Sequence, residues 1–458
     1  MEIGVVVHGS GIVDSGWALE IINLLSKLGN VHCRLGGTMG RTAVIDAGLE
    51  DLIDISLKLL PSESLDLFNR GNMDVIFLLN YGKSAETGQT FGFKAFNHYF
   101  KKISNEDFLA TNHKPLYDSK IPVIQIERPG EEDGSIISWN VSLNRKMDDG
   151  ERVTIPSNEL YDLEDDSDLM TLDHLVEQLS RILNLDIVNP IDIKSKYFSD
   201  NVNLRNQGLF EQFLEDYGGE DKDTFSFRKI NGVNIGENIF INGHVVGTTN
   251  SNDLILVAKD KFLIDVIGGT LKDNASEKLG KITLDAVVVK TGLLRESDKV
   301  KPRVLSKDSK FLNEGEYISS NKDYYLKIGF VNYVAFDIYR LKDCDLVITI
   351  GDDTTLVASD ILYRLDIPIF GIIEGNLDKV VKKPFVSEKS TIVEVPYGLD
   401  VLNDNIYKNL FDENISLTIP FESDVDDMGE FINNNLNRFK ENLFEEIRNV
   451  CSTFNVKK

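Results

Sequence analysis

Two adjacent carboxylates and two hydroxyls follow a short apolar run in the last third of the chain. The run Leu346–Ile350 has the length and β-branched composition of a buried strand, and a helical pattern of apolar residues begins soon after it. The polar string between them would lie at the carboxyl end of the strand, where open α/β sheets bind ligands. Its residues are Gly351, Asp352, Asp353, Thr354 and Thr355.

These residue types suit an anionic ligand and a metal ion. Backbone amides at the start of a helix attract anions, and a glycine allows a ligand to approach the main chain closely. Aspartate oxygens are good ligands for Mg²⁺. We therefore predict that the string orients a phosphate or carboxylate group and that Asp352 and Asp353 hold Mg²⁺ as a cofactor. The alternative is that Asp353 or Thr354 only caps the helix.

Three further polar loops follow the first three strands expected in the N-terminal part, at residues 8–16, 36–42 and 80–88. In a parallel sheet these loops share one edge, so they could surround one pocket. Their positive or titratable side chains, glycine amides and hydroxyls suit a phosphate or carboxylate. The predicted ligand-binding residues are His8, Gly37, Thr38, Arg41, Lys83 and Ser84.

Familiar sequence motifs assign no reaction to these loops. Residues 36–42 lack the GxGxxG spacing, and Phe77 stands where a Walker A loop ending in Gly82-Lys83-Ser84 would have its first glycine. A single histidine at a strand end, such as His8, is more often structural than catalytic. The sequence contains no GxSxG or HExxH string, and its six histidines lack metal-ligand spacing. The sequence thus predicts ligand binding and leaves the catalytic residues unknown.

The elements that position these residues alternate between strand and helix at both ends of the chain. Alternation is typical of parallel sheets covered by helices, whereas glycine-punctuated short strands after residue 226 are typical of hairpins. We predict an α/β fold with N-terminal and C-terminal Rossmann-like parallel-sheet units and a β-rich middle module. The expected segments are a doubly wound α/β domain (1–130), an acidic connection with helices (131–225), the β-rich module (226–295), a linker (296–322), a C-terminal α/β unit (323–400) and a C-terminal helical segment (401–458). Expected elements of the first segment include a helix near residues 92–101 and a fourth strand at 121–126.

The composition argues against several classes of protein. The formal charge is −25, from 74 acidic and 49 basic residues, and nucleic-acid binding instead needs clustered Lys and Arg. No apolar run reaches the ~18 residues of a membrane-spanning helix, and the sequence opens on a strand and has no basic segment typical of a signal peptide. We therefore expect a cytoplasmic protein that binds neither nucleic acid nor membranes. Its three cysteines form no CxxC pair, so we expect no disulfide framework or zinc ribbon.

Several strings resemble an archaeal domain-of-unknown-function family found chiefly in methanogens. They are Val7-His8-Gly9, Asp14-Ser15-Gly16, the nine residues from Leu35 to Ala43, Ile45-Asp46-Ala47-Gly48, Gly351–Thr355 and Asp360-Ile361-Leu362. The resemblance spans most of the chain. It implies the cytoplasm of a methanogen and, by association, a role in methanogenesis or its cofactors, and it brings no assigned catalytic residues.

Two functions fit these observations. The first is an enzyme or binding protein acting on a phosphorylated or carboxylated small molecule, including a nucleotide with Mg²⁺, in methanogen-specific metabolism. The second is a non-catalytic assembly or regulatory protein that forms a homo-oligomer or binds a methanogenesis-related protein partner. An amphipathic pattern in the last ~40 residues predicts a long packing helix that supports the second function.

Overall fold

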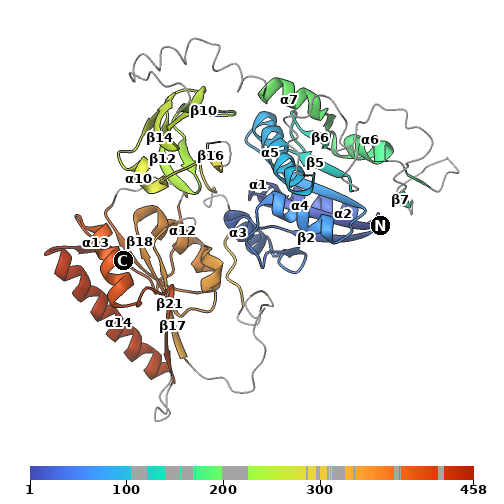
Figure 1. The fold of residues 1–458 in the computed structure, drawn as a ribbon. Coiled ribbons are helices and arrows are strands. Elements are labelled where there is room, and N and C mark those ends of the chain that lie inside the picture. Colours follow the sequence, from blue (N-terminus) through green and yellow to red (C-terminus); the bar gives the residue numbers. More distant parts are fainter. Residues whose placement is uncertain are drawn as a thin grey trace. The chain divides into compact units, whose positions relative to one another are not determined.

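The chain forms two compact units, which we describe separately. The computed structural model describes residues 1–104, 121–139, 155–156, 169–170, 172–198, 225–284, 287–295, 300–306, 309, 311, 325–333, 337–375, 381, 383–420 and 428–458. The first unit contains residues 1–236, 249–276 and 280–287, and the second contains residues 237–248, 277–279 and 288–458. Helices and parallel sheets in both units confirm the predicted α/β class (Figure 1).

The first unit is built on a seven-stranded sheet with the order β3-β2-β1-β4-β5-β6-β9. All neighbouring strands are parallel except β5 and β6, which are antiparallel. The strands are β1 (Glu2–His8), β2 (Asn30–Arg34), β3 (Ile53–Asp54), β4 (Val75–Asn80), β5 (Val123–Glu127), β6 (Ser135–Ser138) and β9 (Asp186–Ile187). Because β4 is buried along its whole length, its sequence is an almost continuous apolar run.

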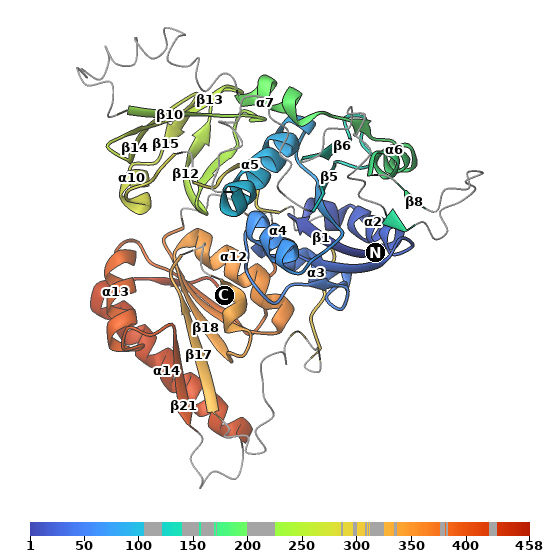
Figure 2. The same ribbon diagram turned by 45° about the vertical axis from the view of Figure 1, so that its right-hand side comes forward.

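Seven helices accompany this sheet among the described residues of the first unit. They are α1 (Gly11–Asp14), α2 (Trp17–Leu25), α3 (Thr38–Ala47), α4 (Pro61–Arg70), α5 (Ala85–Ser104), α6 (Leu172–Leu183) and α7 (Pro190–Phe198). Aromatic side chains of α5 at helical spacing, Phe93, Phe96 and Phe100, pack with residues of α4, β4 and β5 in one core cluster. This cluster fixes α5 beside α4 against the sheet (Figure 2). The first turn of α5 follows the carboxyl end of β4 after a loop of four residues.

The predicted β-rich module is confirmed as a set of short antiparallel strands. In the first unit, β10 (Phe225–Ile230), β13 (Leu254–Lys259) and β14 (Phe262–Ile267) form a sheet in the order β10-β13-β14, and β15 (Gly269–Leu271) follows. In the second unit, β11 (Asn238–Ile241) pairs with β12 (His244–Thr249) and with β16 (Val289–Thr291). A short helix, α10 (Ala275–Leu279), follows β15 in the chain. The Asn242-Gly243 turn has positive φ at both residues, as the hairpin signal requires.

The second unit is built on a six-stranded sheet with the order β21-β17-β18-β19-β20-β22. The four inner strands are parallel, and both edge strands are antiparallel to their neighbours. The strands are β17 (Tyr325–Val331), β18 (Leu346–Ile350), β19 (Ile369–Ile373), β20 (Thr391–Glu394), β21 (Ser416–Pro420) and β22 (Asn455–Val456). The helices are η3 (Ile338–Leu341), α12 (Asp352–Leu362), η4 (Tyr363–Leu365), α13 (Leu399–Asn409) and α14 (Met428–Val450).

The long C-terminal helix α14 packs onto its own unit. Its apolar residues Phe431, Phe439, Leu443 and Ile447 belong to one buried cluster with residues of the six-stranded sheet and of α13. The helix therefore uses its apolar face inside the unit. In the described part of the chain, every helix is too short or too polar to cross a membrane.

Two predicted segments contain strands in addition to the helices expected there. The weakly patterned segment 131–225 contains the buried strand β6, and the segment 401–458, predicted to be helical, contributes the edge strands β21 and β22. These strands have two to five residues, so each is too short for its sequence to show the alternation of apolar and polar residues that indicates a strand. Much of the predicted linker 296–322 lies outside the described residues, as do residues 199–224 of the predicted connection with helices. A small pair of strands, β7 (Ile155–Pro156) and β8 (Leu169–Met170), is antiparallel.

The three cysteines are free thiols, and all three are buried. Cys33 lies on β2, and burial raises the pKa of its thiol to about 12. Burial also raises the pKa of Cys344, before β18, to about 12. Cys451 follows α14 and is fully buried. Buried thiols of this kind act as small apolar side chains.

Candidate functional site

The strand order of the first sheet reverses at β1, and open α/β sheets commonly bind ligands at such a reversal. From β1 the chain runs to β2 and β3 on one side and then to β4 and β5 on the other. Connections from adjacent strands therefore diverge at the carboxyl ends of β1 and β4, which is where open α/β sheets form a crevice. His8 ends β1 and Asn80 ends β4, and the two residues stand opposite each other in the register.

The three predicted N-terminal loops meet at this edge. A Cβ atom added to Gly40, in the first turn of α3, would lie 3.1 Å from the carbonyl oxygen of Gly9 in the loop after β1. A Cβ atom added to Gly11 would lie 3.2 Å from the carbonyl oxygen of Tyr81 in the loop after β4. The main chains can approach this closely because no side chain stands between them. The structure thus brings together loops that are up to 70 residues apart, as Gly11 and Tyr81 are.

Helix α3 starts at this edge and positions three of the predicted residues. Gly37 occupies the N-cap position in an extended conformation and has no side chain to cap the helix, and Thr38 is the first helical residue. The first-turn amides of α3 are therefore oriented toward the edge where an anion could bind. Arg41, one turn further, is fully buried, and binding of a ligand by its guanidinium stays a prediction. Thr42, which was not among the predicted residues, lies beside Arg41 and donates its hydroxyl to the carbonyl of Thr38 at 3.1 Å.

Lys83 and Ser84 occupy the loop between β4 and α5. Lys83 is exposed. Ser84 and Thr87 bond to each other's backbone: the Ser84 amide donates to Thr87 Oγ1 at 3.0 Å, and the Thr87 amide donates to Ser84 Oγ at 3.3 Å. These bonds satisfy amides at the start of α5. Ser84 thus has a capping role at α5 in addition to its predicted place near a ligand.

A buried carboxyl group, Glu127, lies behind the edge and was not singled out from the sequence. It ends β5 and is fully buried. Its Oε1 accepts a hydrogen bond from the Gly82 amide at 2.7 Å, and its Oε2 accepts from Asn80 Nδ2 at 2.7 Å and from Gln125 Nε2 at 2.8 Å. Burial raises the pKa of Glu127 to about 7, although these donors act in the opposite direction. The network fixes the loop after β4 to the end of β5.

Two glycines inside α5 make room for this network. A Cβ atom on Gly88 would lie 1.9 Å from the carboxyl carbon of Glu127, and one on Gly92 would lie 1.6 Å from Gln125 Oε1. Any larger residue would collide with the buried polar groups. Glycine costs roughly 1 kcal/mol relative to alanine inside a helix, and close approach of the carboxyl and amide groups explains why it is used here.

The network also orients His8. Asn80 Nδ2 donates to Glu127, so the amide oxygen of Asn80 faces His8. This oxygen lies 2.7 Å from His8 Nδ1 and can only accept, so Nδ1 carries a proton. In the neutral ring the lone pair is then on Nε2. The ring of Phe91 stacks on the imidazole with 3.8 Å between the ring centres and holds its plane. His8 is half-buried and thus presents one defined tautomer at the edge.

The string predicted in the C-terminal part has a partly structural role. Asp352 accepts hydrogen bonds from the backbone amides of Gly375 at 2.8 Å and Glu374 at 3.2 Å, so it links the carboxyl ends of β18 and β19. Thr355 Oγ1 lies 2.9 Å from Thr349 Oγ1 in a buried contact between α12 and β18. The strand order follows chain order from β17 to β20, so these parallel strands, all within the described residues, form no reversal of the kind seen at β1.

The capping alternative for Asp353 and Thr354 takes a different form in the structure. The N-cap residue of α12 is Gly351, with φ of 101°, and both aspartates lie inside the first helical turn. Thr354 is buried and Asp353 is half-buried. In the described ranges, no group of three or more His, Cys, Asp or Glu residues is arranged to hold a metal ion. Magnesium binding by Asp352 and Asp353 stays a prediction, because phosphate and water oxygens could supply the other ligands.

A buried ion pair further along α12 was also not predicted. Asp360 and Arg364 are both fully buried, with 3.2 Å between Oδ2 and Nη1. Asp360 Oδ1 accepts from the Phe385 amide at 3.0 Å, and the Arg364 guanidinium lies over the ring of Phe385 at 5.5 Å. The pair ties α12 to the segment between β19 and β20.

Comparison with known proteins identifies a family that spans both units. The model of a family described as an uncharacterised protein conserved in archaea, DUF2117, matches residues 5–414. The chain belongs to the DUF2117 family. It is 37% identical over 447 residues to Uncharacterized protein MJ0065 of Methanocaldococcus jannaschii, and the aligned region covers 98% of this chain and 94% of that protein. No solved structure matches the chain. These matches confirm the archaeal family suggested by the sequence strings around His8, Gly37 and Asp352.

Proposed function

We propose that this DUF2117 protein binds a phosphorylated or carboxylated small molecule at the carboxyl ends of β1 and β4. The observation that carries the proposal is the reversal of strand order at β1, together with the three loops that meet there. Ligands of open α/β sheets bind at such reversals because diverging connections leave a crevice. The uncapped start of α3 supplies backbone donors for an anion.

His8 gives this edge a defined chemical character. Its Nδ1 is held by Asn80, so Nε2 can accept a proton from a ligand when the ring is neutral and donate one when the ring is protonated. An ionised phosphate or carboxylate can accept a hydrogen bond from Nε2 of the protonated ring, and a phosphate that still carries a proton can donate one to Nε2 of the neutral ring. Because Asn80 and Phe91 already fix the imidazole of His8, a ligand would bind it at a lower cost in conformational entropy. We assign His8 to ligand recognition and leave the class of reaction open.

The proposal is tested by calorimetry of the full chain with inorganic phosphate, AMP and ATP, each with and without Mg²⁺. We expect at least one of these ligands to bind, and we expect His8→Gln to weaken that binding at least tenfold. His98→Gln is the matched control, because His98 is exposed on α5. Wild-type protein that gives no heat at millimolar concentrations of all three ligands would refute the proposal. Equal binding by His8→Gln would remove His8 from the site.

The second function considered, a platform for a protein partner, has less support. The sequence argument for it was the long amphipathic C-terminal helix. The apolar side of α14 is buried within its own unit, so this helix provides no reason to expect a partner. We therefore favour the small-molecule function.

A further inference from the structure

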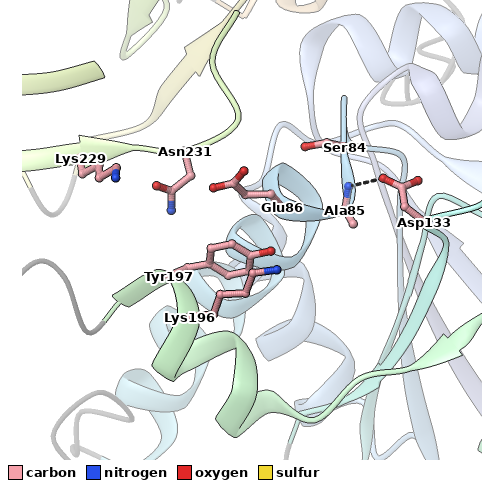
Figure 3. A pocket seen from close by; sticks show the side chains of 8 residues that line it. All are labelled: Ser84, Ala85, Glu86, Asp133, Lys196, Tyr197, Lys229 and Asn231. Atoms are coloured by element: carbon pink, nitrogen blue, oxygen red, sulfur yellow. Dashed lines mark hydrogen bonds between the residues drawn. The ribbon is translucent and has the colours of Figure 1, made fainter. Parts of the chain in front are cut away.

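A polar cavity of about 460 Å³ lies at the start of α5 in the first unit. Its wall is formed by the first turn of α5, the turn between β5 and β6, the end of α7 and the end of β10 (Figure 3). Volumes of roughly 300–1,000 Å³ are typical of small-molecule sites. In the sheet, β5 and β6 lie on the opposite side of β4 from β1. The cavity shares Ser84, Ala85 and Glu86 with the segment 80–88, whereas its other lining residues lie outside the three loops of the proposed edge. The inference therefore goes beyond the proposed function.

One of the two carboxylates in the wall is already neutralised by the protein. Asp133 Oδ1 accepts from Arg128 Nε at 2.7 Å, and Asp133 Oδ2 accepts from the Ala85 amide at 2.8 Å. Burial would raise the pKa of Asp133, but these bonds outweigh it and lower the pKa. Asp133 thus remains a bound anion that occupies the first amide of α5. A ligand phosphate would meet this carboxylate there, so the start of α5 does not act as an anion site.

Three other charged side chains can face a ligand. Lys196, at the end of α7, lies with Nζ 4.9 Å from the ring centre of Tyr197. Lys229 Nζ, on β10, lies 3.7 Å from Oδ1 of the exposed Asp253. Glu86, in the first turn of α5, reaches toward Asn231 in Figure 3. Together they supply two positive charges and one negative charge.

We propose that this cavity binds an amino dicarboxylate, a small molecule with two carboxylates and one ammonium group, as in glutamate or aspartate. The two ammonium groups of Lys196 and Lys229 pair with the two carboxylates, and Glu86 pairs with the ammonium of the ligand. Asn231 and the Tyr197 hydroxyl offer neutral hydrogen bonds. The charge pattern of the wall is the complement of such a ligand, and complementary charge gives specificity. Simple dianions fit less well because Glu86 repels them.

The plainer reading is that these charges are solvated and that Glu86 only stabilises the start of α5 through the helix dipole. Binding distinguishes the two readings. We would titrate the full chain with L-glutamate, L-aspartate and glutarate, the last of which has the two carboxylates without the amine. The proposal expects saturable binding of L-glutamate or L-aspartate and at least tenfold weaker binding of glutarate.

Variants at the three charged residues then test which of them contacts the ligand. Lys196→Gln and Lys229→Gln are each expected to weaken binding of the amino dicarboxylate at least tenfold, and Glu86→Gln is expected to reduce its advantage over glutarate at least fivefold. Lys27→Gln is the matched control, since Lys27 lies between α2 and β2 at the other end of the strands. His8→Gln should leave this binding unchanged, which separates it from the proposed function. The proposal would be overturned if wild-type protein gave no heat at about 10 mM ligand. It would also be overturned if glutarate bound as tightly as L-glutamate and L-aspartate.

Discussion

The buried carboxyl group of Glu127 makes the stability of the first unit depend on pH. Its pKa is raised from an ordinary value of 4.5 to about 7 in the folded protein, because burial disfavours the charged form. The folded state therefore holds the proton between these two values, whereas the unfolded state releases it. The stabilising effect is complete below about pH 4.5 and is lost as the pH rises through about 7.

The size of this effect follows from the two pKa values. Their difference of about 2.5 pH units, at about 1.36 kcal/mol per unit, corresponds to about 3.4 kcal/mol in total. Between pH 5 and pH 8 about 2.5 kcal/mol of it would be lost by linkage. Glu127 is fully buried, so solvent screening does not reduce this figure as it would at the surface. We therefore expect the free energy of unfolding of the first unit to fall by about this amount over that range.

The variant Glu127→Gln isolates the contribution. It places an NH₂ group where the Gly82 amide or the two side-chain amides also donate, so at pH 5 it should be less stable than wild type by about 1–3 kcal/mol. Because it does not titrate, it should lose the fall between pH 5 and pH 8. Glu20→Gln, which makes the same change at an exposed position on α2, should keep the wild-type pH dependence.

Urea unfolding followed by tryptophan fluorescence is the appropriate assay. The chain has two tryptophans, Trp17 and Trp139, and both lie in the first unit. Trp139 donates to Gln125 Oε1 at 3.2 Å, one hydrogen bond away from Glu127. The emission thus reports the region in question. A wild-type free energy of unfolding that stays constant from pH 5 to pH 8, or a Glu127→Gln variant that falls as steeply as wild type, would refute the reasoning.

Two further predictions concern the second unit, and both can be measured by urea unfolding followed by circular dichroism. Asp360→Ala leaves the fully buried Arg364 without its carboxylate and should lower the free energy of unfolding by about 3–5 kcal/mol. Its control, Asp366→Ala, breaks only the exposed pair with Lys389 and should change this free energy by less than about 1 kcal/mol. Equal effects of the two variants would contradict the argument. Asp352→Ala removes the acceptor for the Glu374 and Gly375 amides and should lower the free energy of unfolding by about 1–3 kcal/mol with or without Mg²⁺. A loss of stability that appears only when Mg²⁺ is present would instead favour magnesium binding by Asp352.

The strands were predictable because burial on both faces leaves a continuous apolar run. The predicted strand 346–350 coincides with β18, and the expected strand 121–126 overlaps β5, which covers Val123–Glu127. Helix α5 was harder. The sequence placed a helix near residues 92–101, whereas α5 begins at Ala85. Gly88 and Gly92 weaken the helical pattern, and only the structure shows that they leave space for Glu127 and Gln125.

The sequence indicated the three loops of the candidate site, but it did not indicate the hydrogen-bond network of Glu127 behind them. His8 was found because it follows a strand directly. Asn80 and Glu127 are 47 residues apart and form no motif, so their hydrogen bond could not be read from spacing. A usable signal did exist, since Gln125 and Glu127 lie in an otherwise apolar strand. Burying a polar side chain without a hydrogen-bond partner costs free energy, so both residues indicate partners inside the fold. Arg41 shows the opposite case, because sequence gives its charge and not its burial.

The burial of all three thiols allows each unit to be followed by chemical labelling. Cys33 lies in the first unit, and Cys344 and Cys451 lie in the second. An alkylating reagent reacts with the thiolate, so these groups stay protected until the surrounding structure opens. Peptide mapping of the modified cysteines after a pulse of reagent would then report two opening rates from one sample, without any engineered probe. Such rates would tell whether the two halves of the chain unfold together or one after the other.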